Sequence, residues 1–534
     1  MPGMVVAPQP EAAEAGADVL ARGGNAIDAA VVAAFVQGVA DPLMCGIGGF
    51  GSMHVYMPGR GVHEILEFYA RAPLAARPEM WADKLVGQSR DGFAFLLEGG
   101  GSEYGPLAVC TPGSVRGYAE ALARYGTLDW ADAMAPAIAL ARRGVLVRPH
   151  MHWFWSQDQR GTGQVNTDDK LMLSPTARTV YLREDGSVKR PGDVLRNPDL
   201  ARTLERLALG GPDLFYRGEL AEEIAADFQA SGGLITQADL HGYELSVAAP
   251  IWGEYRGHRI ATSPPPASGM LVLQLLHMLE NFPLGSLEHN GVEHVRILAE
   301  AMKRMTIDKD RHMGDPAYVD VPVERLTSKS YCAELASAIS RGERAHVRRL
   351  DRSDRETTHV SALDRDGNAV ALTHTLGSPS GAITEGLGFM YNGSMSRFDP
   401  RPGHAGSIAP GKRRASSAAP TIVFRGDSPN IVIGAPGGSY IAPAVAQGIS
   451  NVIDFGMSML EAVAAPRIVA VSDSIDVSNR VLRRVTDALE AEGYDIKRSP
   501  QSYAFAALHG IAVRDGRLSG GADPQRDGMA VLVP

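Results

Sequence analysis

The sequence predicts an α+β protein, and two patterns in its final third lead to that prediction. Residues 357–375 contain two alternating segments around Asp-Gly-Asn, a combination typical of a β-hairpin. Residues 420–436 repeat the pattern, and residues 437–466 then favour helices. Strands followed by helices that would cover their sheet are the arrangement of an α+β domain.

The N-terminal region is expected to contain helices followed by strands. Residues 10–41 predict two helices joined by Gly23 and Gly24, because a glycine pair can cap a helix and permit a turn. Residues 51–57 and 63–70 alternate in hydrophobicity, which favours strands. Both element types are therefore expected well before the hairpins.

Residues 190–345 are expected to be mostly helical. The pattern is interrupted at residues 255–269, "YRGHRIATSPPPASG", where a short strand runs into a proline-rich loop. The sequence has no internal repeat or low-complexity linker, so no clean domain boundary is predicted.

The composition is that of an ordinary globular protein and argues against nucleic acid as a partner. The 534 residues carry a formal net charge of −9, and the densest basic stretch, residues 411–417, is too short to neutralise a phosphate backbone. The longest apolar run, Ala26–Ala40, contains Asp28 and is too short to span a bilayer, so a buried helix is expected and no membrane partner. The first residues lack the pattern of a signal peptide, which leads us to expect a cytoplasmic protein.

Three motif-like segments have simpler explanations than a cofactor or a metal ion. Residues 46–51, "GIGGFG", match the dinucleotide-binding pattern, but a helix is expected before them and a strand after, the reverse of the required order. A tight turn where backbone approaches backbone is favoured instead. Residues 364–368, "DRDGN", lack the glutamate that completes a calcium loop, and His150 and His152 are expected in an aromatic-rich surface loop. Three widely spaced cysteines form no zinc or disulfide pattern: Cys45, Cys110 and Cys332.

A hydroxyl cluster at residues 356–361, "ETTHVS", opens the first predicted hairpin. A threonine in a strand usually only packs and satisfies a backbone hydrogen bond. If the peptide bond before Thr357 were cut, however, Thr357 would gain an α-amino group with a pKa of about 8, which can act as the base for its own hydroxyl. Thr357 is therefore a candidate N-terminal nucleophile.

The same hairpin carries a family resemblance that extends over nearly the whole chain. "TTHVSALDRDGNAVALTHTLGSPSGA" resembles the γ-glutamyltranspeptidase family of N-terminal-nucleophile hydrolases. "GGNAIDAAVVAAF", "TPGSVRGY" and "LAEAMKRMTIDKDRHMGDP" are similar to earlier motifs of that family. "PGKRRASSAAPTIV", "GAPGGSYI" and "ADPQRDGMA" follow in the family's order. Each motif alone is weak, whereas the ordered series is specific.

The resemblance implies a self-processing hydrolase with a four-layer αββα sandwich fold. The chain would be cut between Glu356 and Thr357, giving a large fragment of residues 1–356 and a small fragment of residues 357–534, interwoven in one domain. An inactive scaffold or binding protein of the same fold is the alternative, and cleavage before Thr357 distinguishes the two.

The resemblance also implies roles for individual residues. Thr357 corresponds to the nucleophile, and Thr375 corresponds to the residue that orients and activates it. A hairpin turning at residues 366–367 would bring these threonines opposite each other. Gly437 and Gly438 correspond to the oxyanion hole, where glycine lets backbone N–H groups approach an intermediate. The serine pair that binds the substrate carboxylate corresponds to Ser416 and Ser417. Three further residues either pack in the strand or assist maturation: Thr358, His359 and Ser361.

Two segments depart from the family's pattern for binding a γ-glutamyl group. Tyr69, in "FYARAP", replaces the arginine that binds the substrate α-carboxylate, and Arg71 on the same strand face could supply the cation. In "NGSMSRF", Ser394 stands where an amide is usual, and Arg397 stands where a key aspartate is usual. A substrate ammonium group facing Arg397 would lose its ion pair and meet repulsion, unless a rebuilt loop brought Asp399 to it.

We therefore expect an N-terminal-threonine amidohydrolase whose small-molecule amide substrate has a carboxylate on its acyl group and no α-ammonium. Acylases that remove glutaryl-type groups and oxamate amidohydrolases are the nearest family models. Water is the expected acyl acceptor, with an amine as the alternative. A γ-glutamyl hydrolase or transpeptidase is the main alternative function. Neither a cofactor nor a metal ion is expected.

Overall fold

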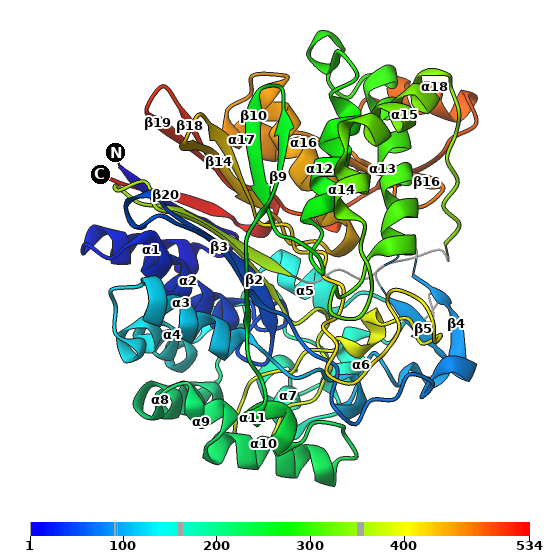
Figure 1. Ribbon diagram of the computed structural model, residues 1–534. Helices are drawn as coiled ribbons and strands as arrows, with labels where there is room; N and C mark the ends of the chain where they lie inside the picture. Colours follow the sequence, from blue (N-terminus) through cyan, green and yellow to red (C-terminus); the bar gives the residue numbers. More distant parts are fainter. Residues whose placement is uncertain (1, 90–91, 93, 159–163, 350–356) are drawn as a thin grey trace.

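Two β-sheets lie face to face in the computed structural model, and helices cover the outer face of each sheet (Figure 1). The structure describes residues 2–89, 92, 94–158, 164–349 and 357–534. The layers follow the order helix, sheet, sheet, helix. The predicted α+β fold, a four-layer αββα sandwich, is confirmed.

Within the described residues, the first sheet has seven strands, and every neighbouring pair is antiparallel. In spatial order its strands are β20 (Met529–Val533), β1 (Gly3–Ala7), β11 (Thr358–Leu363), β12 (Ala369–Thr375), β2 (Phe50–Met57), β3 (Val62–Phe68) and β8 (Ser246–Ala248). β11 and β12 confirm the hairpin predicted within residues 357–375. Its turn is closed by Asp364, whose carboxylate accepts the backbone N–H groups of Asp366 at 2.9 Å and Asn368 at 3.0 Å.

The second sheet has six strands in the part of the chain that the structure describes, and its neighbouring pairs are again all antiparallel. In spatial order they are β19 (Arg517–Ala522), β18 (His509–Arg514), β14 (Ser428–Gly434), β13 (Thr421–Arg425), β10 (His258–Thr262) and β9 (Ile251–Tyr255). β13 and β14 confirm the second predicted hairpin. Other strands of the described residues form smaller, separate sheets. One sheet contains β15 (Ile468–Val469), β16 (Ser474–Ser478) and β17 (Asp495–Ser499), another contains β4 (Leu85–Gln88) and β5 (Phe95–Leu97), and another contains β6 (Val145–Leu146) and β7 (Val194–Leu195).

The helices divide into two groups, one for each sheet. Those that share a hydrophobic core with the first sheet are α1 (Pro10–Ala21), α2 (Ala26–Ala40), α3 (Ser114–Tyr125), α4 (Trp130–Arg143), α5 (Pro149–Trp155), α6 (Thr167–Leu171), α7 (Pro175–Tyr181), α8 (Pro198–Gly210), α9 (Asp213–Tyr216), α10 (Glu219–Ala230) and α11 (Gln237–His241). Those that share a core with the second sheet are α12 (Gly269–Leu279), α13 (Val292–His312), α14 (Val323–Thr327), α15 (Lys329–Ser340), α16 (Ile441–Ile453), α17 (Met459–Ala464) and α18 (Arg483–Ala491).

Helix α2 begins at a reciprocal cap that explains where the first helix pair divides. The Asn25 side chain accepts the backbone N–H groups of Ile27 and Asp28, and the Asp28 carboxylate accepts the N–H of Asn25 at 2.9 Å. Gly23, just before the cap, has a φ of +94° that favours glycine. The two helices predicted within residues 10–41 are therefore confirmed.

Strand alternation separates the outer cores from the contact between the sheets. Strand β12 directs Val370 and Leu372 toward the helices and Ala369 and Ala371 toward the second sheet. The alanines meet side chains of the second sheet such as Ile422, so the space between the sheets is filled by small and branched residues. The same alternation decides which hydroxyl groups at the hairpin's end face the second sheet.

Residues 46–49 form the glycine-rich turn that the sequence predicts between helix α2 and strand β2, and residues 50–51 begin the strand. A Cβ on Gly49 would overlap the carbonyl oxygen of Thr375, and a Cβ on Gly51 would lie 2.5 Å from the carbonyl oxygen of Thr373. Glycine is needed here because the backbone of β12 passes directly against the turn. The turn thus fixes the end of β12 in place.

Both large sheets contain strands from each side of Thr357. β1, β2, β3, β8, β9 and β10 precede this residue, and the other strands of the two sheets follow it. Glu356, on the other side of the expected cut, lies outside the described residues. Because hydrogen-bonded ladders join the two segments, a chain cut before Thr357 would remain one folded unit.

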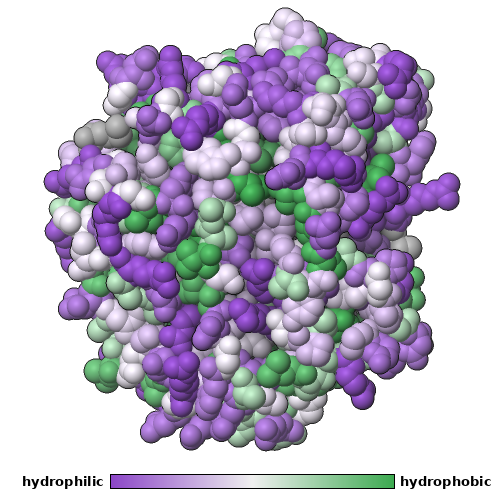
Figure 2. Space-filling model, viewed as in Figure 1, coloured by the Kyte–Doolittle hydropathy of each residue, from purple (hydrophilic) through white to green (hydrophobic). Residues whose placement is uncertain are grey.

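The face of the molecule in Figure 2 is mostly hydrophilic, with hydrophobic side chains in small separate groups. None of the helices in the described part of the chain is long and apolar enough to cross a membrane. The apolar run Ala26–Ala40 is helix α2, and nearly all its side chains are buried, as predicted.

Candidate active site

Thr357 and Thr375 face each other at the open end of the β11–β12 hairpin. Thr358 pairs with His374, so residues 357 and 375 are the next opposite positions. Thr357 Oγ1 donates a hydrogen bond to Thr375 Oγ1 at 3.3 Å, and Thr375 Oγ1 also accepts the Gly377 backbone N–H at 2.7 Å. The structure thus brings the two sequence-predicted threonines together, and both side chains are buried.

His359 lies between the sheets, two residues after Thr357. Its Nδ1 bonds the Thr373 hydroxyl at 2.8 Å, and its Nε2 bonds the Ser361 hydroxyl at 3.0 Å. Burial lowers the pKa of His359 to about 3, with a further contribution from His374. The ring is therefore neutral at physiological pH and is held by strand residues.

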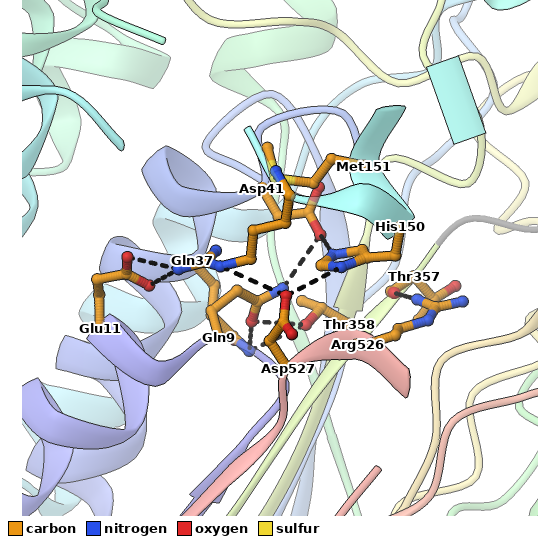
Figure 3. Close-up of polar contacts among 11 residues, drawn as sticks. Gln9, Glu11, Gln37, Asp41, His150, Met151, Thr357, Thr358, Arg526 and Asp527 are labelled. Carbon is orange, nitrogen blue, oxygen red and sulfur yellow. Dashed lines mark hydrogen bonds and ion pairs between the residues drawn. The ribbon is translucent and has the colours of Figure 1, made fainter. Parts of the chain in front are cut away.

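The backbone around Thr357 is held from both faces of the sheet (Figure 3). The Arg526 guanidinium donates to the Thr357 carbonyl oxygen at 3.3 Å. Thr358 points to the opposite face, where Gln37 Nε2 donates to its hydroxyl at 2.9 Å and to Gln9 Oε1 at 2.8 Å. These contacts fix the register of the residue that would become a new chain end.

The glutamine pair continues into a buried ionic cluster (Figure 3). Gln9 Nε2 donates to Asp41 at 3.2 Å, and His150 Nε2 lies 3.4 Å from the same carboxylate. Burial alone would lower the pKa of His150, but hydrogen bonds to Asp41 and Asp527 outweigh it and raise the pKa. The predicted surface loop at His150 is wrong, because the residue lies in helix α5 and is 1% exposed. Among the described residues, no group of three or more His, Cys, Asp or Glu side chains could hold a metal ion.

Gly437 and Gly438 form a sharp turn between strand β14 and helix α16. Their φ angles are +139° and +56°, in the region that favours glycine. A Cβ on Gly437 would lie 2.5 Å from the Ala506 Cα, so the turn has no room for a larger residue. A Cβ on Gly434, at the end of β14, would overlap the His359 ring. The turn therefore starts from a strand that packs against the hairpin carrying the threonine pair.

A pocket of about 140 Å³ is connected to the threonine pair through Arg397, although its described lining includes neither threonine and neither Gly437 nor Gly438. Gly377, whose N–H binds Thr375, accepts at its carbonyl a hydrogen bond of 2.7 Å from Arg397, which lines the pocket. Ser439, directly after the turn at residues 437–438, also lines it. The charged lining residues are Lys309, Asp310, Arg397, Asp399, Arg401 and Arg414. Because cations outnumber carboxylates in this wall, the pocket suits an anion.

Ser416 and Ser417 line the same pocket. The Ser416 backbone N–H donates to the Pro266 carbonyl at 2.7 Å, and its hydroxyl accepts the Ala418 N–H at 3.2 Å. Ser416 is therefore held at a fixed position in the pocket wall, and Ser417 and Arg414 line the same pocket.

Three sequence-predicted binding residues are absent from the described lining of this pocket: Arg71, Tyr69 and Ser394. The Arg71 guanidinium donates to the Glu244 carbonyl at 2.6 Å and lies over the Tyr243 ring. Tyr69 is buried in a neighbouring hydrophobic cluster, and the Ser394 hydroxyl donates to a main-chain carbonyl at 3.4 Å. The expectation that Arg71 supplies a cation to the pocket therefore finds no support in the geometry.

Arg414 is one of several pocket residues that the sequence did not single out, together with Lys309 and Arg401. Its neighbour Arg413 points away and binds Glu67 at 2.6 Å and Asp315 at 2.7 Å, whereas Arg414 faces the pocket with Ser416. Side chains alternate along extended chain, so two adjacent arginines here have different surroundings. Counting back from the serine pair could not have identified Arg414, because Ser416 and Ser417 both line the pocket, so no local signal points to it.

Comparisons with known proteins agree with this geometry. The sequence profile of the family described as gamma-glutamyltranspeptidase matches residues 12–533. The acylase ACY 1 proenzyme of Pseudomonas sp. (strain SE83) is 38% identical over 541 residues, covering 99% of this chain and 93% of that protein. The glutathione hydrolase proenzyme of Bacillus subtilis (strain 168) is 33% identical over 555 residues, covering 99% and 91%.

A solved structure gives the same result for the fold. Cephalosporin acylase from Bacillus halodurans superposes with a TM-score of 0.87 at 29% identity, covering 99% of this chain and 95% of that one. The resemblance inferred from the motifs is thus confirmed over the whole sequence. The chain belongs to the gamma-glutamyltranspeptidase family and is an N-terminal-nucleophile hydrolase, an enzyme of the amidohydrolase and acyltransferase class.

Proposed function

We propose that the protein cuts itself before Thr357 and then hydrolyses an amide whose acyl group carries a carboxylate and no α-ammonium. A pocket lined by Arg397 and Arg414 supports this proposal, because Arg397 donates to the carbonyl of Gly377, whose N–H binds Thr375. A carboxylate is stabilised there, whereas an added ammonium group would face Arg397. Relatives named as acylases support the same reading.

The chemistry would run through a threonine ester. The α-amino group of Thr357 takes the proton of its own hydroxyl, and Oγ1 attacks the amide carbonyl carbon. Thr375 holds that hydroxyl at 3.3 Å, and the N–H groups of Gly437 and Gly438 would stabilise the oxyanion. The C–N bond breaks as the proton passes to the leaving amine, and water then hydrolyses the ester, releasing the acid and freeing Thr357.

A γ-glutamyl hydrolase or transpeptidase is the second candidate, favoured by one observation. Asp399 lines the pocket and is 4% exposed, so it could bind a substrate ammonium group. It already accepts hydrogen bonds from the Arg401 guanidinium at 2.9 and 2.7 Å, and a γ-glutamyl substrate would have to compete with that ion pair. This competition makes the second candidate the weaker one.

A matched pair of chromogenic substrates separates the candidates. Glutaryl-p-nitroanilide and γ-glutamyl-p-nitroanilide have the same acyl chain and the same distal carboxylate. They differ only in the ammonium group that the γ-glutamyl compound carries on the carbon next to that carboxylate. We expect kcat/KM for the glutaryl compound to be higher by about 30-fold or more, the effect of a few kcal/mol of charge repulsion in a buried site. Efficient release of p-nitroaniline from the γ-glutamyl compound alone would refute the proposal.

A further inference from the structure

Helix α2 places a buried glutamine, Gln37, behind the threonine pair, on the helix-covered face of the first sheet (Figure 3). Thr358 and His374 are cross-strand partners, and each is the chain neighbour of one of the two threonines. Side chains alternate along a strand, so Thr358 and His374 point to the opposite face of the sheet from Thr357 and Thr375. Gln37 bonds both of them, at 2.9 Å and 2.7 Å respectively. One side chain of α2 therefore joins β11 to β12 at the positions next to the candidate reacting residues.

Each hydrogen bond of this contact has a defined donor and acceptor. Gln37 Nε2 donates to the Thr358 hydroxyl and, at 2.8 Å, to Gln9 Oε1, so Gln37 Oε1 is the atom that accepts from His374 Nε2. Burial lowers the pKa of His374 to about 3, so its ring is neutral and carries its one N–H at Nε2. The Tyr118 hydroxyl then donates to His374 Nδ1 at 2.7 Å. The network is thus satisfied by one tautomer of the ring and one orientation of the amide.

The network has no room to rearrange, because its members are buried. Gln37 and His374 are 0% exposed, and Thr358 is 1% exposed. A buried polar group that loses its partner pays the full cost of its desolvation, so each member holds the others in place. The position of helix α2 is therefore transmitted to the ends of β11 and β12.

The hydroxyl contact on the other face of the sheet has little tolerance for displacement. Thr357 Oγ1 lies 3.3 Å from Thr375 Oγ1, whereas O–H···O hydrogen bonds usually span about 2.5–3.0 Å. A further shift of a few tenths of an ångström between the two strand ends would break this contact. The alignment of the strands at these positions thus decides whether Thr375 can hold the candidate nucleophile.

We propose that Gln37 is a positioning residue, which sets the distance between the Thr357 and Thr375 hydroxyls by clamping β11 to β12 from the helix side. This inference rests on the proposed function and extends it to a residue that does not touch the substrate. A buried glutamine can also do no more than satisfy its polar neighbours, and it then affects stability without a special effect on the reaction. The two roles differ in what they do to kcat.

The test compares three forms of the full-length protein: the wild type, Gln37→Leu and the matched control Gln447→Leu. Gln447 is also a buried helical glutamine, 5% exposed, but its amide bonds the backbone of Pro443 and Ile468. Intact mass establishes that each form has been cut, and thermal unfolding measures its stability. Activity is measured with whichever of glutaryl- and γ-glutamyl-p-nitroanilide the wild type hydrolyses faster, so the acyl preference does not enter the result.

The expected result is a loss of kcat confined to Gln37→Leu. Its kcat should fall by about 10- to 100-fold with KM unchanged, the effect of misplacing a reacting group by less than about 1 Å. Gln447→Leu should unfold at a similarly lowered temperature and keep its kcat. In the double variant Gln37→Leu/Thr375→Val, kcat should fall little below that of Thr375→Val alone, because both changes act through the same hydroxyl contact.

A folded Gln37→Leu chain that stays uncut has lost the first reaction of Thr357, which also supports the inference. If Gln37→Leu does not fold, Thr358→Val carries the test, because it breaks only the bond from Gln37 to β11. The loss of one hydrogen bond should then lower kcat by about 3- to 10-fold.

A cleaved Gln37→Leu enzyme with wild-type kcat would overturn the inference, as would an unchanged kcat in Thr358→Val where that variant carries the test. An equal fall in Gln447→Leu would show a general effect of stability, and losses that multiply in the double variant would show that Gln37 acts elsewhere. In each of these cases, turnover by the wild type leaves the proposed function standing. A wild type that stays uncut, or that hydrolyses neither compound, refutes the proposed function and this inference together.

Discussion

Replacing Gly437 with alanine should disable the proposed oxyanion turn while leaving the threonine pair in place. The new Cβ would lie 2.5 Å from both the Cα and the Cβ of Ala506. Carbon atoms attract each other at about 3.5 Å, so the turn must move by about 1 Å. A displacement of about 1 Å costs about 100-fold in rate, and loss of one oxyanion donor costs about 100- to 1,000-fold. We therefore expect kcat to fall by about 100-fold or more.

The assay is steady-state turnover of glutaryl-p-nitroanilide by protein whose self-cleavage has been verified by intact mass. Gly456→Ala is the matched control, because Gly456 also has a positive φ, +67°, but a Cβ there meets no atom within 4 Å. Backbone strain without a clash should leave kcat unchanged. A cleaved Gly437→Ala enzyme with wild-type kcat would show that this N–H group does not stabilise the transition state.

Three further predictions concern the nucleophile, its pH dependence and the stability of the fold. Thr375→Val removes the acceptor of the Thr357 hydroxyl and of the Gly377 N–H, so kcat should fall by about 10- to 100-fold; an unchanged kcat would contradict the orienting role. Since the pKa of His359 is about 3, its ring stays neutral from pH 5 to 9. The value of kcat/KM should therefore rise with pH in a single step, as the Thr357 amine loses its proton at about pH 8. A second rise near pH 6.5 would contradict this expectation. Asp28→Ala removes the acceptor of four hydrogen bonds at the start of α2. The free energy of unfolding, measured by urea titration, should fall by about 3 kcal/mol. A change below about 0.5 kcal/mol would show that the cap is dispensable.

The hairpins and the first helix pair could be predicted from the sequence because local rules decide them. Alternating side chains and an Asp-Gly turn specify β11 and β12 without reference to the rest of the molecule. Once that hairpin is known, the opposition of Thr357 and Thr375 follows from counting residues back from the turn. The turn at residues 46–49 was predictable for the same reason, since a preceding helix excludes the dinucleotide-binding arrangement.

The walls of the pocket could not be predicted in the same way, because they depend on contacts between distant segments. The Arg414 backbone N–H donates to the Ala70 carbonyl, so the basic segment lies along the chain that carries Arg71. Only this pairing shows which arginine turns inward. Spacing placed Arg71 on one face with Tyr69, but the extended strand β3 ends at Phe68, and the alternation rule no longer applies beyond it.

His150 illustrates the limit of local composition as a guide to burial. A histidine close to Trp153 and Trp155 is expected in a surface loop, yet His150 lies in helix α5 and is buried against Asp41, which supplies a charged partner. The partner is 109 residues away in sequence, so no local pattern could have indicated it.

The central claim is that the chain becomes an enzyme by cutting itself before Thr357, and the intact mass of the purified, denatured protein tests it most directly. We predict two fragments for the wild type and for Thr357→Ser, split before residue 357 and summing to the full chain plus one water, and a single uncut chain for Thr357→Ala. A wild-type chain that stays whole, or one cut equally well in Thr357→Ala, would contradict the account, because Thr357 would then have neither its amine base nor its part in the cleavage.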